Sequence, residues 1–369
     1  MRLSEPAILD VLKTIKHPEH GNDIVSLGMV QGLTHSNTNV RFALSLLKSN
    51  DPFASSVKKA CIKALLGEFG EGISIDIEVK APVAQAKDSP YKIEASVSKV
   101  KNIIAIASGK GGVGKSTIAV NLAVAVAKTG AKVGLIDADI FGPSIPKMLG
   151  MEDARPEIFK EGEMELIRPV ENYGVQHLSI GFFVNPNEAL VWRGPMATNA
   201  LRQLIHQGAW GELDYLFIDM PPGTSDIHLT LVQEVSVTGA IIVSTPQDVA
   251  LADAVKGISM FTGESIKVPV LGLVENMAWF TPEELPNNRY YIFGKDGCKK
   301  LAERMRLPLL GQIPIVQSIR EGGDNGTPVA TGTGIMANAF AELASNVISE
   351  VIKRNSEMPS TKKVEIKHK

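Results

Sequence analysis

NIIAIASGKGGVGKSTIAVNLAVAVAK, residues 102–128, is the stretch of sequence that decides the fold. An apolar run, a glycine-rich loop and a longer apolar run follow one another in it, which is the order of a buried strand, a loop and a helix. Gly109, Gly114, Lys115 and Ser116 fulfil the pattern G-x-x-x-x-G-K-[S/T] of a phosphate-binding loop. A chance glycine-rich turn would lack the flanking strand and helix, so the pattern predicts a nucleotide-binding ATPase.

The chemistry of phosphate binding explains the spacing of this loop. Glycines allow backbone N–H groups to approach phosphate oxygens, and the helix that begins near Lys115 points its positive end at the same anion. Lys115 would neutralise charge on the β- and γ-phosphates, and the Ser116 hydroxyl would bind Mg²⁺. The residues expected to contact Mg-ATP are Ser108, Gly109, Lys110, Gly111, Gly112, Val113, Gly114, Lys115, Ser116 and Thr117.

Further short apolar runs follow the loop and alternate with helical patterns. The runs KVGLIDAD, YLFIDMPP, GAIIVSTP, PVLGLVEN and PLLGQIP are typical of strands buried on both faces. Helical spacing predicts helices over 196–205 and 336–351. The pattern predicts the α/β class, with a parallel-sheet P-loop NTPase domain over residues 100–354.

Acidic residues end two of the predicted strands. Asp137 and Asp139 end the run LIDAD, and Asp219 ends YLFID. Ligands of open α/β sheets bind at the carboxyl ends of the strands, so Asp137 and Asp219 are candidates for the Mg²⁺ site. The alternative interpretation of Asp137 and Asp139 is that they cap a following helix. The alternative for Asp219 is a simple Asp-Pro-Gly turn. The N–H of Gly223, in the stiff turn after Asp219, could contact the γ-phosphate.

The chain outside this domain divides into three parts. Residues 1–80 carry helical spacing over 4–16 and 57–65 and alternation over 40–46 and 73–79, which predicts a small α+β domain that precedes the P-loop domain. Residues 81–99 contain two prolines and little periodicity, so we predict a linker. The polar stretch 355–369 is predicted to be a disordered tail.

Composition narrows the class of protein. Of 369 residues 44% are apolar, and the net charge is −2, which gives no global field toward nucleic acid or anionic membrane. Two cysteines, Cys61 and Cys298, exclude a disulfide framework and suit a reducing cytosol. We find no basic and apolar leader and no apolar run long enough to span a bilayer, and expect a cytoplasmic protein without nucleic-acid or membrane partners.

GKGGVGKST also resembles the deviant Walker A signature of the MinD and nitrogenase iron-protein superclass. The resemblance implies an ATP-dependent homodimer in which Lys110 reaches the partner's nucleotide and stabilises charge in the transition state together with Lys115. It further implies that Asp139 positions or deprotonates the attacking water and that Asp137 supports Mg²⁺. By the same resemblance Asn276 would hydrogen-bond the adenine ring, and the ring would be flanked by Pro314 and Ile315.

The segments GKGGVGKST, DADIFGPS, WRGPM, LDYLFIDMPPGTSDIHLTL and VENM together resemble the Mrp/ApbC family over residues 95–350. The N-terminal unit, with HPEHGNDIVSLGMV, resembles a small domain found in iron–sulfur targeting factors. The resemblance implies an ATPase dimer that carries an iron–sulfur cluster to apoproteins.

The chain departs from the family in its cysteines, since the N-terminal unit lacks the cysteine that its relatives often carry near SNDPFAS. The family's Cys-x-x-Cys pair is absent, since the corresponding stretch reads AWFTPEELPNNRYYIFG. Cys61 and Cys298 have the spacing of core residues, so no cluster ligands are visible. A metal-free, nucleotide-switched adaptor or chaperone is therefore the alternative function. In it the aromatic loop would either contact a protein partner or pack on its own domain, through Trp279, Phe280, Tyr290 and Tyr291. A partitioning ATPase would require an amphipathic helix or basic face that the C-terminal stretch lacks.

Overall fold

The computed structural model describes residues 3–18, 21–36, 38–46, 53–70, 72–80, 97–140, 142–162, 164–183, 194–282, 284–285, 287–361 and 363. The chain divides into two compact units, Met1–Lys92 and Ile93–Lys369, which are described separately. Residues 81–96, most of the predicted linker, lie outside the described residues, and 97–99 form a turn.

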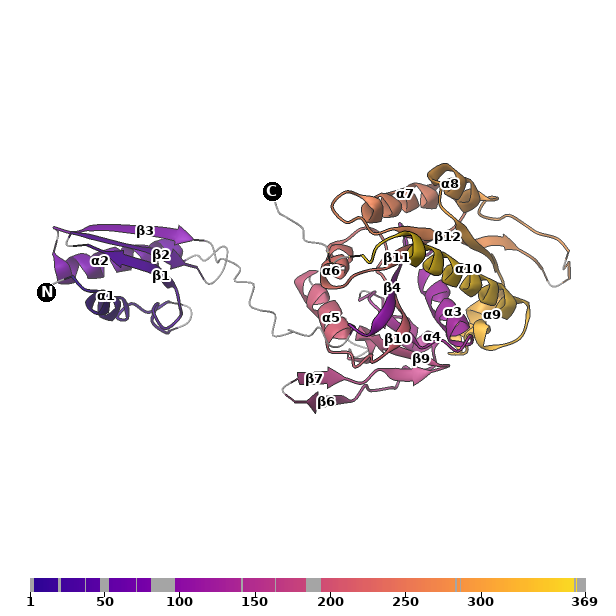
Figure 1. Ribbon diagram of the computed structural model, residues 1–369, viewed down its shortest axis with the longest axis horizontal. Helices are drawn as coiled ribbons and strands as arrows, with labels where there is room; N and C mark the ends of the chain where they lie inside the picture. The colour runs from indigo at the N-terminus through magenta and orange to yellow at the C-terminus, as the bar shows by residue number, and fades with distance from the viewer. Residues whose placement is uncertain are drawn as a thin grey trace. The chain divides into compact units, whose positions relative to one another are not determined.

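The described residues of the first unit form a three-stranded sheet and two helices (Figure 1). The elements are α1 (Glu5–Leu12), β1 (Val30–His35), β2 (Asn39–Ser45), α2 (Ala54–Phe69) and β3 (Ser74–Lys80). β2 pairs antiparallel with β1 and parallel with β3, so α2 is the crossover between two parallel strands. The apolar faces of both helices close the core over the sheet.

Two sequence expectations for this unit need correction. The first helix ends at Leu12, short of the predicted residue 16. Strand β1 was not predicted, because VQGLTH has a central glycine and its register shifts between Gln31 and Thr34, which interrupts the alternation.

An eight-stranded sheet is formed by the described residues of the second unit. Its order is β13 (Leu309–Ile315), β12 (Val270–Phe280), β11 (Gly239–Ser244), β4 (Val100–Ala107), β10 (Leu213–Asp219), β5 (Val133–Asp137), β9 (Val175–Ser179) and β8 (Val170–Asn172). All neighbouring pairs are parallel except the edge pair β8–β9. The central strands are buried on both faces, which explains their continuous apolar runs. The predicted parallel sheet is confirmed, with one antiparallel edge.

Helices cover both faces of this sheet (Figure 1). One face packs against α3 (Lys115–Ala127), α4 (Ile145–Met148) and α10 (Ile335–Glu357). The other packs against α5 (Gly194–His206), α6 (Asp226–Glu234), α7 (Asp248–Thr262) and α8 (Gly297–Met305). Smaller elements are the β6 (Ile158–Glu161) and β7 (Met164–Ile167) ribbon, η1 (Ile180–Phe182), α9 (Gln317–Asp324) and η2 (Val329–Thr331).

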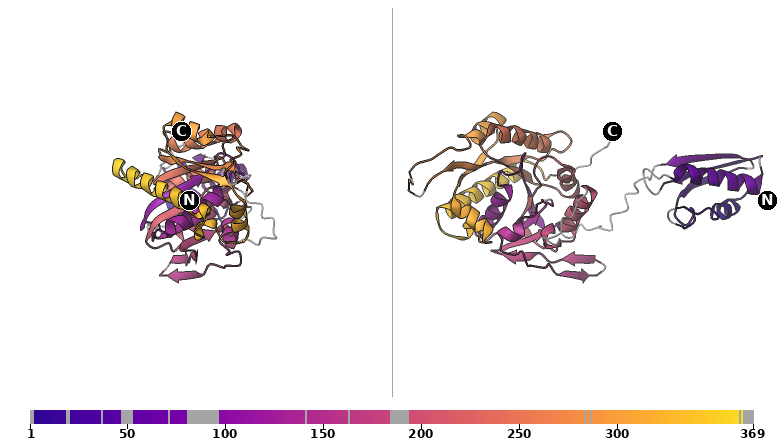
Figure 2. Two further views of the ribbon diagram at one scale, coloured as in Figure 1. Left: turned by 90° about the vertical axis from the view of Figure 1, so that its right-hand side faces the viewer. Right: turned by 180° about the vertical axis from the view of Figure 1, so that it is seen from behind.

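Helix α10 lies beside α3, as yellow and purple ribbons in Figures 1 and 2 show. It continues to Glu357, so its last turn enters the stretch predicted to be a disordered tail. Within the described part of the chain it is the one helix long and apolar enough to span a bilayer. Phe340, Leu343 and Val347 are nevertheless buried in the core, as expected for a helix that covers a sheet.

Candidate functional site

The glycine-rich loop joins the central strand β4 to α3, as the sequence predicts. Gly112 and Gly114 have φ of 81° and 79°, a left-handed conformation that residues with a Cβ adopt only with strain. Gly109 lies against the backbone of Asp253 and Ala254 in α7, so any side chain there would collide with that helix. The loop therefore needs glycine at 112 and 114 for its backbone angles and at 109 for packing.

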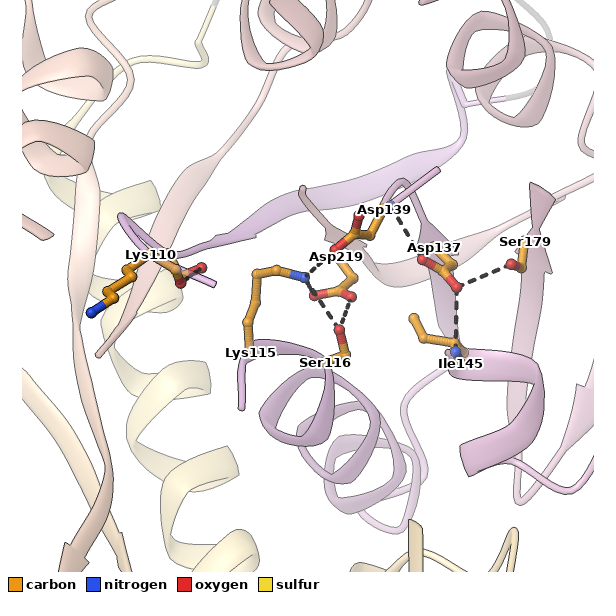
Figure 3. A network of polar contacts seen from close by, with 9 residues as sticks. Lys110, Lys115, Ser116, Asp137, Asp139, Ile145, Ser179 and Asp219 are labelled. Atoms are coloured by element: carbon orange, nitrogen blue, oxygen red, sulfur yellow. Dashed lines mark hydrogen bonds and ion pairs between the residues drawn. The ribbon is translucent and has the colours of Figure 1, made fainter. Parts of the chain in front are cut away.

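Three polar side chains meet beneath the loop (Figure 3). Lys115 Nζ lies 2.7 Å from Asp219 Oδ1 and donates to Ser116 Oγ at 3.2 Å. Ser116 Oγ donates to Asp219 Oδ2 at 2.6 Å. Asp219 is fully buried at the end of β10, and Lys115 is 6% exposed at the start of α3. The cluster joins the lysine predicted to bind phosphate, the hydroxyl predicted to bind Mg²⁺ and the Asp219 carboxylate predicted to belong to the Mg²⁺ site.

Asp137 lies beside this cluster at the end of β5 and is also fully buried. Its Oδ2 accepts from Ser179 Oγ at 3.0 Å and from the N–H of Ile145 at 3.3 Å, and its Oδ1 accepts from the N–H of Asp139 at 3.2 Å (Figure 3). Burial, followed by repulsion from Asp219, raises the pKa of the Asp137 carboxyl above its ordinary value. A cation bound between Asp137 and Asp219 would relieve this cost.

The donor atoms at this edge fit Mg²⁺ chemically. Ser116 and the carboxylates of Asp137 and Asp219 provide hard oxygen atoms, and Mg²⁺ in nucleotide sites takes few protein ligands and completes its shell with phosphate and water. Among the described residues no group of three or more His, Cys, Asp or Glu is placed to hold a metal ion by itself.

Asp139 and Lys110 lie on opposite sides of the loop lysine. Asp139 Oδ2 is 3.9 Å from Lys115 Nζ, and its side chain is 17% exposed. Lys110 is exposed, and its side chain extends away from the carboxylate cluster (Figure 3). Asp139 is thus within reach of the phosphate lysine, whereas the Lys110 amine has no part in this cluster.

The turn after Asp219 contacts the loop through its backbone. The N–H of Gly223 donates to the carbonyl of Ser108 at 2.9 Å, and Gly223 has a φ of 81°. The predicted contact of this N–H with a γ-phosphate would require this hydrogen bond to open. That exchange would link occupation of the loop to the conformation of residues 220–225.

The residues expected at the base lie at the end of two neighbouring strands. Asn276 on β12 pairs in register with Ile313, which directly precedes Pro314 and Ile315 on β13. The side chain of Asn276 is 6% exposed, and its Nδ2 donates to the carbonyl of Val113 at 2.8 Å. Asn276 thus holds the glycine-rich loop through Val113. The side-chain N–H that makes this hydrogen bond points at the Val113 carbonyl and not at a nucleotide.

The chain's two thiols do not resemble cluster ligands. Cys61 and Cys298 are both fully buried, one in each unit. Burial raises the pKa of the Cys61 thiol to about 12 and raises that of Cys298 as well. Only thiolates bind iron, so neither residue is prepared to hold a cluster. The prediction that both are core residues is confirmed.

Sequence reasoning missed the residues that orient Asp137. Ser179 ends β9, a strand absent from the predicted set, and the N–H of Ile145 begins the four-residue helix α4. Little in the sequence signals this strand, because VQHLS has only two apolar residues, Val175 and Leu178, among three polar ones.

The profiles of two known protein families match this chain, one in each of its two units. The profile of the family described as NUBPL iron-transfer P-loop NTPase matches residues 99–348. A second profile, described as iron-sulfur cluster assembly protein, matches residues 5–79.

Individual relatives agree with these profiles. An iron-sulfur cluster carrier protein of Synechocystis sp. is 42% identical over 351 residues, which covers 95% of this chain and 98% of the relative. A mitochondrial iron-sulfur protein required for NADH dehydrogenase in Arabidopsis thaliana is 50% identical over 69% of this chain and 80% of its own length. A nucleotide-binding protein of Archaeoglobus fulgidus, solved with ADP, is 39% identical with a TM-score of 0.54, over 63% of this chain and 88% of that one.

Proposed function

The chain belongs to the NUBPL iron-transfer P-loop NTPase family, and on this premise we propose that it is an ATPase that handles iron–sulfur clusters and delivers them to apoproteins. The observation that carries the ATPase part is the cluster of Lys115, Ser116 and Asp219 beneath a glycine-rich loop. The similarity to an iron-sulfur cluster carrier protein along nearly the full length of both chains supports the cargo.

The site residues have separate tasks in this proposal. The loop N–H groups and Lys115 bind the β- and γ-phosphates of ATP. The adenine ring packs against Asn276, Pro314 and Ile315, and the pairing of Asn276 with Ile313 on the neighbouring strands β12 and β13 supports this role. Asp139 orients the attacking water, because it stands beside the phosphate lysine at the edge of the site. Mg²⁺ held by Ser116, Asp137 and Asp219 would neutralise charge that develops on the phosphate oxygens.

We propose that hydrolysis is slow in the isolated subunit and requires a homodimer. The exposed Lys110, directed away from its own carboxylate cluster, is available to the nucleotide of a second copy (Figure 3). A lysine supplied in this way would stabilise transition-state charge as an arginine finger does. Turnover per subunit should therefore rise with protein concentration, and it should not rise for Lys110→Ala.

The cluster is cargo in this proposal, and the chain's own residues do not fit it as a full ligand set. The chain has two cysteines, both buried with a raised thiol pKa, whereas iron–sulfur clusters are held by deprotonated thiolates, usually four. Even a homodimer would contribute only two Cys298 thiols at one place. Ligands from an apoprotein or assembly factor would have to complete the set.

With both thiols reduced, we place the protein in the cytoplasm.

The burial of both cysteines also favours a second candidate, a metal-free nucleotide-switched adaptor, and an aromatic cluster near residue 280 offers it a surface for a protein partner. A hairpin pairs Phe280 with Tyr290 by two backbone hydrogen bonds of 2.8 Å, and Arg289 stacks 4.2 Å above the Trp279 ring. Tyr290 is 45% exposed. Aromatic residues held in this way are typical anchors for a protein partner.

Anaerobic reconstitution with iron and sulfide, run on the chain alone and together with an apoprotein that supplies thiolates, separates the two candidates. The readouts are iron per subunit, the absorption spectrum and ATP turnover of the same sample. Stoichiometric iron with a cluster band in the wild type, lost in Cys298→Ser and kept in Cys61→Ser, would support the carrier with Cys298 as a ligand. A protein that hydrolyses ATP normally and takes up no cluster under either condition would refute the carrier and support the adaptor.

A further inference from the structure

His228 is a buried polar ring close to the phosphate site, and it has no part in the lysine and carboxylate cluster described above. It is the third residue of α6, the helix that directly follows the turn of residues 220–225. The side chain is 0% exposed, and its ring packs edge to face against Phe261 of α7, with 6.3 Å between the ring centroids. Buried polar groups in proteins are normally hydrogen-bonded, so the partners of both ring nitrogens are informative.

The Nδ1 atom of His228 is used. The backbone N–H of Ser225 donates to it at 3.2 Å, in the arrangement of a capping box, in which the third helical residue is usually Glu or Gln. A backbone N–H can only donate, so Nδ1 is the acceptor and the neutral ring carries its proton on Nε2. Burial first, and then the positive charge of Lys115, lower the pKa of this imidazole to about 4, which keeps the ring neutral near pH 7.

The Nε2–H of His228 is not used. Nε2 is buried and has no hydrogen-bond partner among the described residues. The backbone of Pro221 lies close enough to the ring to affect its pKa, and because proline has no N–H, the group concerned is the Pro221 carbonyl. An acceptor thus lies near the buried donor, but the two form no hydrogen bond in this structure. A buried donor without a partner costs free energy, which a small shift of Pro221 would recover.

The turn of residues 220–225 can make such a shift. The N–H of Gly223 donates to the carbonyl of Ser108 at 2.9 Å, and this is the hydrogen bond that a γ-phosphate would have to open. If the phosphate takes the Gly223 N–H, the backbone of the turn moves with it. The imidazole of His228 lies against the turn on both sides of Gly223, at Pro221 and at Ser225, so it is placed to respond to that movement.

We propose that His228 is a positioning residue that favours the ATP-bound conformation of the 220–225 turn, an inference that rests on the proposed ATPase function. Its Nδ1 holds Ser225 with either nucleotide. Its Nε2–H donates to the Pro221 carbonyl only when the Gly223 N–H has left Ser108 for the γ-phosphate. A donor that is unpaired without the γ-phosphate and paired with it makes ATP bind more tightly relative to ADP, because a ligand shifts an equilibrium by its differential affinity for the two states.

The ratio of the ATP and ADP affinities tests this role. Equilibrium titration of the full chain with Mg-ADP and with the Mg complex of a non-hydrolysable ATP analogue gives the two dissociation constants. His228→Leu removes both the acceptor and the donor, and His228→Asn keeps only an acceptor within reach of Ser225. Both variants should bind the analogue about tenfold more weakly, with little change for Mg-ADP. His228→Gln, whose amide carries an acceptor and a donor spaced much as the ring nitrogens are, should restore the wild-type ratio.

Thr230→Val is the matched control. Thr230 lies in the same helix, is 5% exposed and donates to the Asp226 carbonyl at 2.9 Å, so the variant loses a hydrogen bond inside α6 without altering the turn. Its two dissociation constants should stay within about twofold of the wild type.

The outcomes separate this proposal from the proposed function. The proposal alone is overturned if the wild type binds both nucleotides and the His228 variants weaken both in the same proportion, or if His228→Gln behaves like His228→Leu. A wild type that binds neither nucleotide would refute the proposed ATPase function, and this proposal with it.

Nitrogen NMR of the wild type keeps the test decisive even if the leucine and asparagine variants fail to fold. In protein with isotope-labelled histidine, the ring signals of His228 are assigned by their loss in His228→Gln. With Mg-ADP we expect an unprotonated Nδ1 and a protonated Nε2. Replacing Mg-ADP by the ATP analogue should move the Nε2–H proton to lower field, because it then forms a hydrogen bond. A proton resonance that does not move overturns the proposal.

Discussion

The buried pair of Lys115 and Asp219 should contribute to stability even without nucleotide, and Lys115→Met tests this. The pair joins a 6% exposed ammonium to a fully buried carboxylate across 2.7 Å. Removing one partner of a buried pair costs about 3–5 kcal/mol, since the other charge stays buried without compensation. The Ser116 hydroxyl would still donate to Asp219, so we expect a loss of about 2–4 kcal/mol in the free energy of unfolding.

Protonation of Asp219 in the variant sets an upper limit on the free energy of unfolding that Lys115→Met can cost. Protonating a carboxyl with the ordinary pKa of 3.8 at pH 7 costs about 4 kcal/mol, because 7 − 3.8 is 3.2 units at about 1.36 kcal/mol each. Without Lys115 the folded pKa of Asp219 rises further above its unfolded value. The folded state then binds the extra proton, so the cost of the substitution should grow as pH rises from 5 to 7 and shrink toward acid.

Urea unfolding followed by tryptophan fluorescence measures this cost. All three tryptophans of the chain, Trp192, Trp210 and Trp279, belong to the second unit, so the signal reports that unit. Lys147→Met is the matched control, because Lys147 and Glu152 form a pair at 3.9 Å with side chains 54% and 62% exposed, and such pairs contribute below about 1 kcal/mol.

A double-mutant cycle completes the argument. Asp219→Asn combined with Lys115→Met removes both charges of the pair and leaves neither without its partner, so the double variant should lose less stability than the sum of both single losses. The reasoning is refuted if Lys115→Met costs no more than Lys147→Met, or if its cost does not change between pH 5 and 7. Independently of stability, Lys115→Met should weaken Mg-ATP binding at least tenfold in equilibrium titration, since a charge-assisted hydrogen bond to phosphate is lost.

Three other predictions concern loop packing, turnover and pH. Gly109→Ala should destabilise the second unit by about 2 kcal/mol or more, because its Cβ meets the α7 backbone, whereas Gly334→Ala, with open space, should change little; equal urea midpoints would contradict this. Asp139→Ala should keep Mg-ATP affinity and lose turnover about 100-fold or more, and full turnover would exclude its role with water. Hydrogen bonds from His206 and Arg202 lower the pKa of Glu234 to about 2. Its stabilisation is therefore present above pH 4.5 and lost as pH falls toward 2; after screening it should amount to about 1–2 kcal/mol, measured as the pH-dependent difference from Glu234→Gln.

Local sequence determined the parts of this protein that depend on neighbouring residues. The strand, glycine loop and helix of residues 102–128 follow from apolar periodicity and from the backbone freedom of glycine. Asp137 and Asp219 could be placed at one edge, because β5 and β10 are parallel and both end in an aspartate. The apolar spacing around Cys61 and Cys298 likewise gave their burial correctly.

Only the tertiary structure decided the contacts between distant segments. Strand order places Ser179 against Asp137, and it places Asn276 on the carbonyl of Val113. The packing of α6 beside α7 places the ring of His228 against Phe261. Periodicity reports which face of an element is buried but not which element covers it, because that choice depends on the summed packing of the whole sheet.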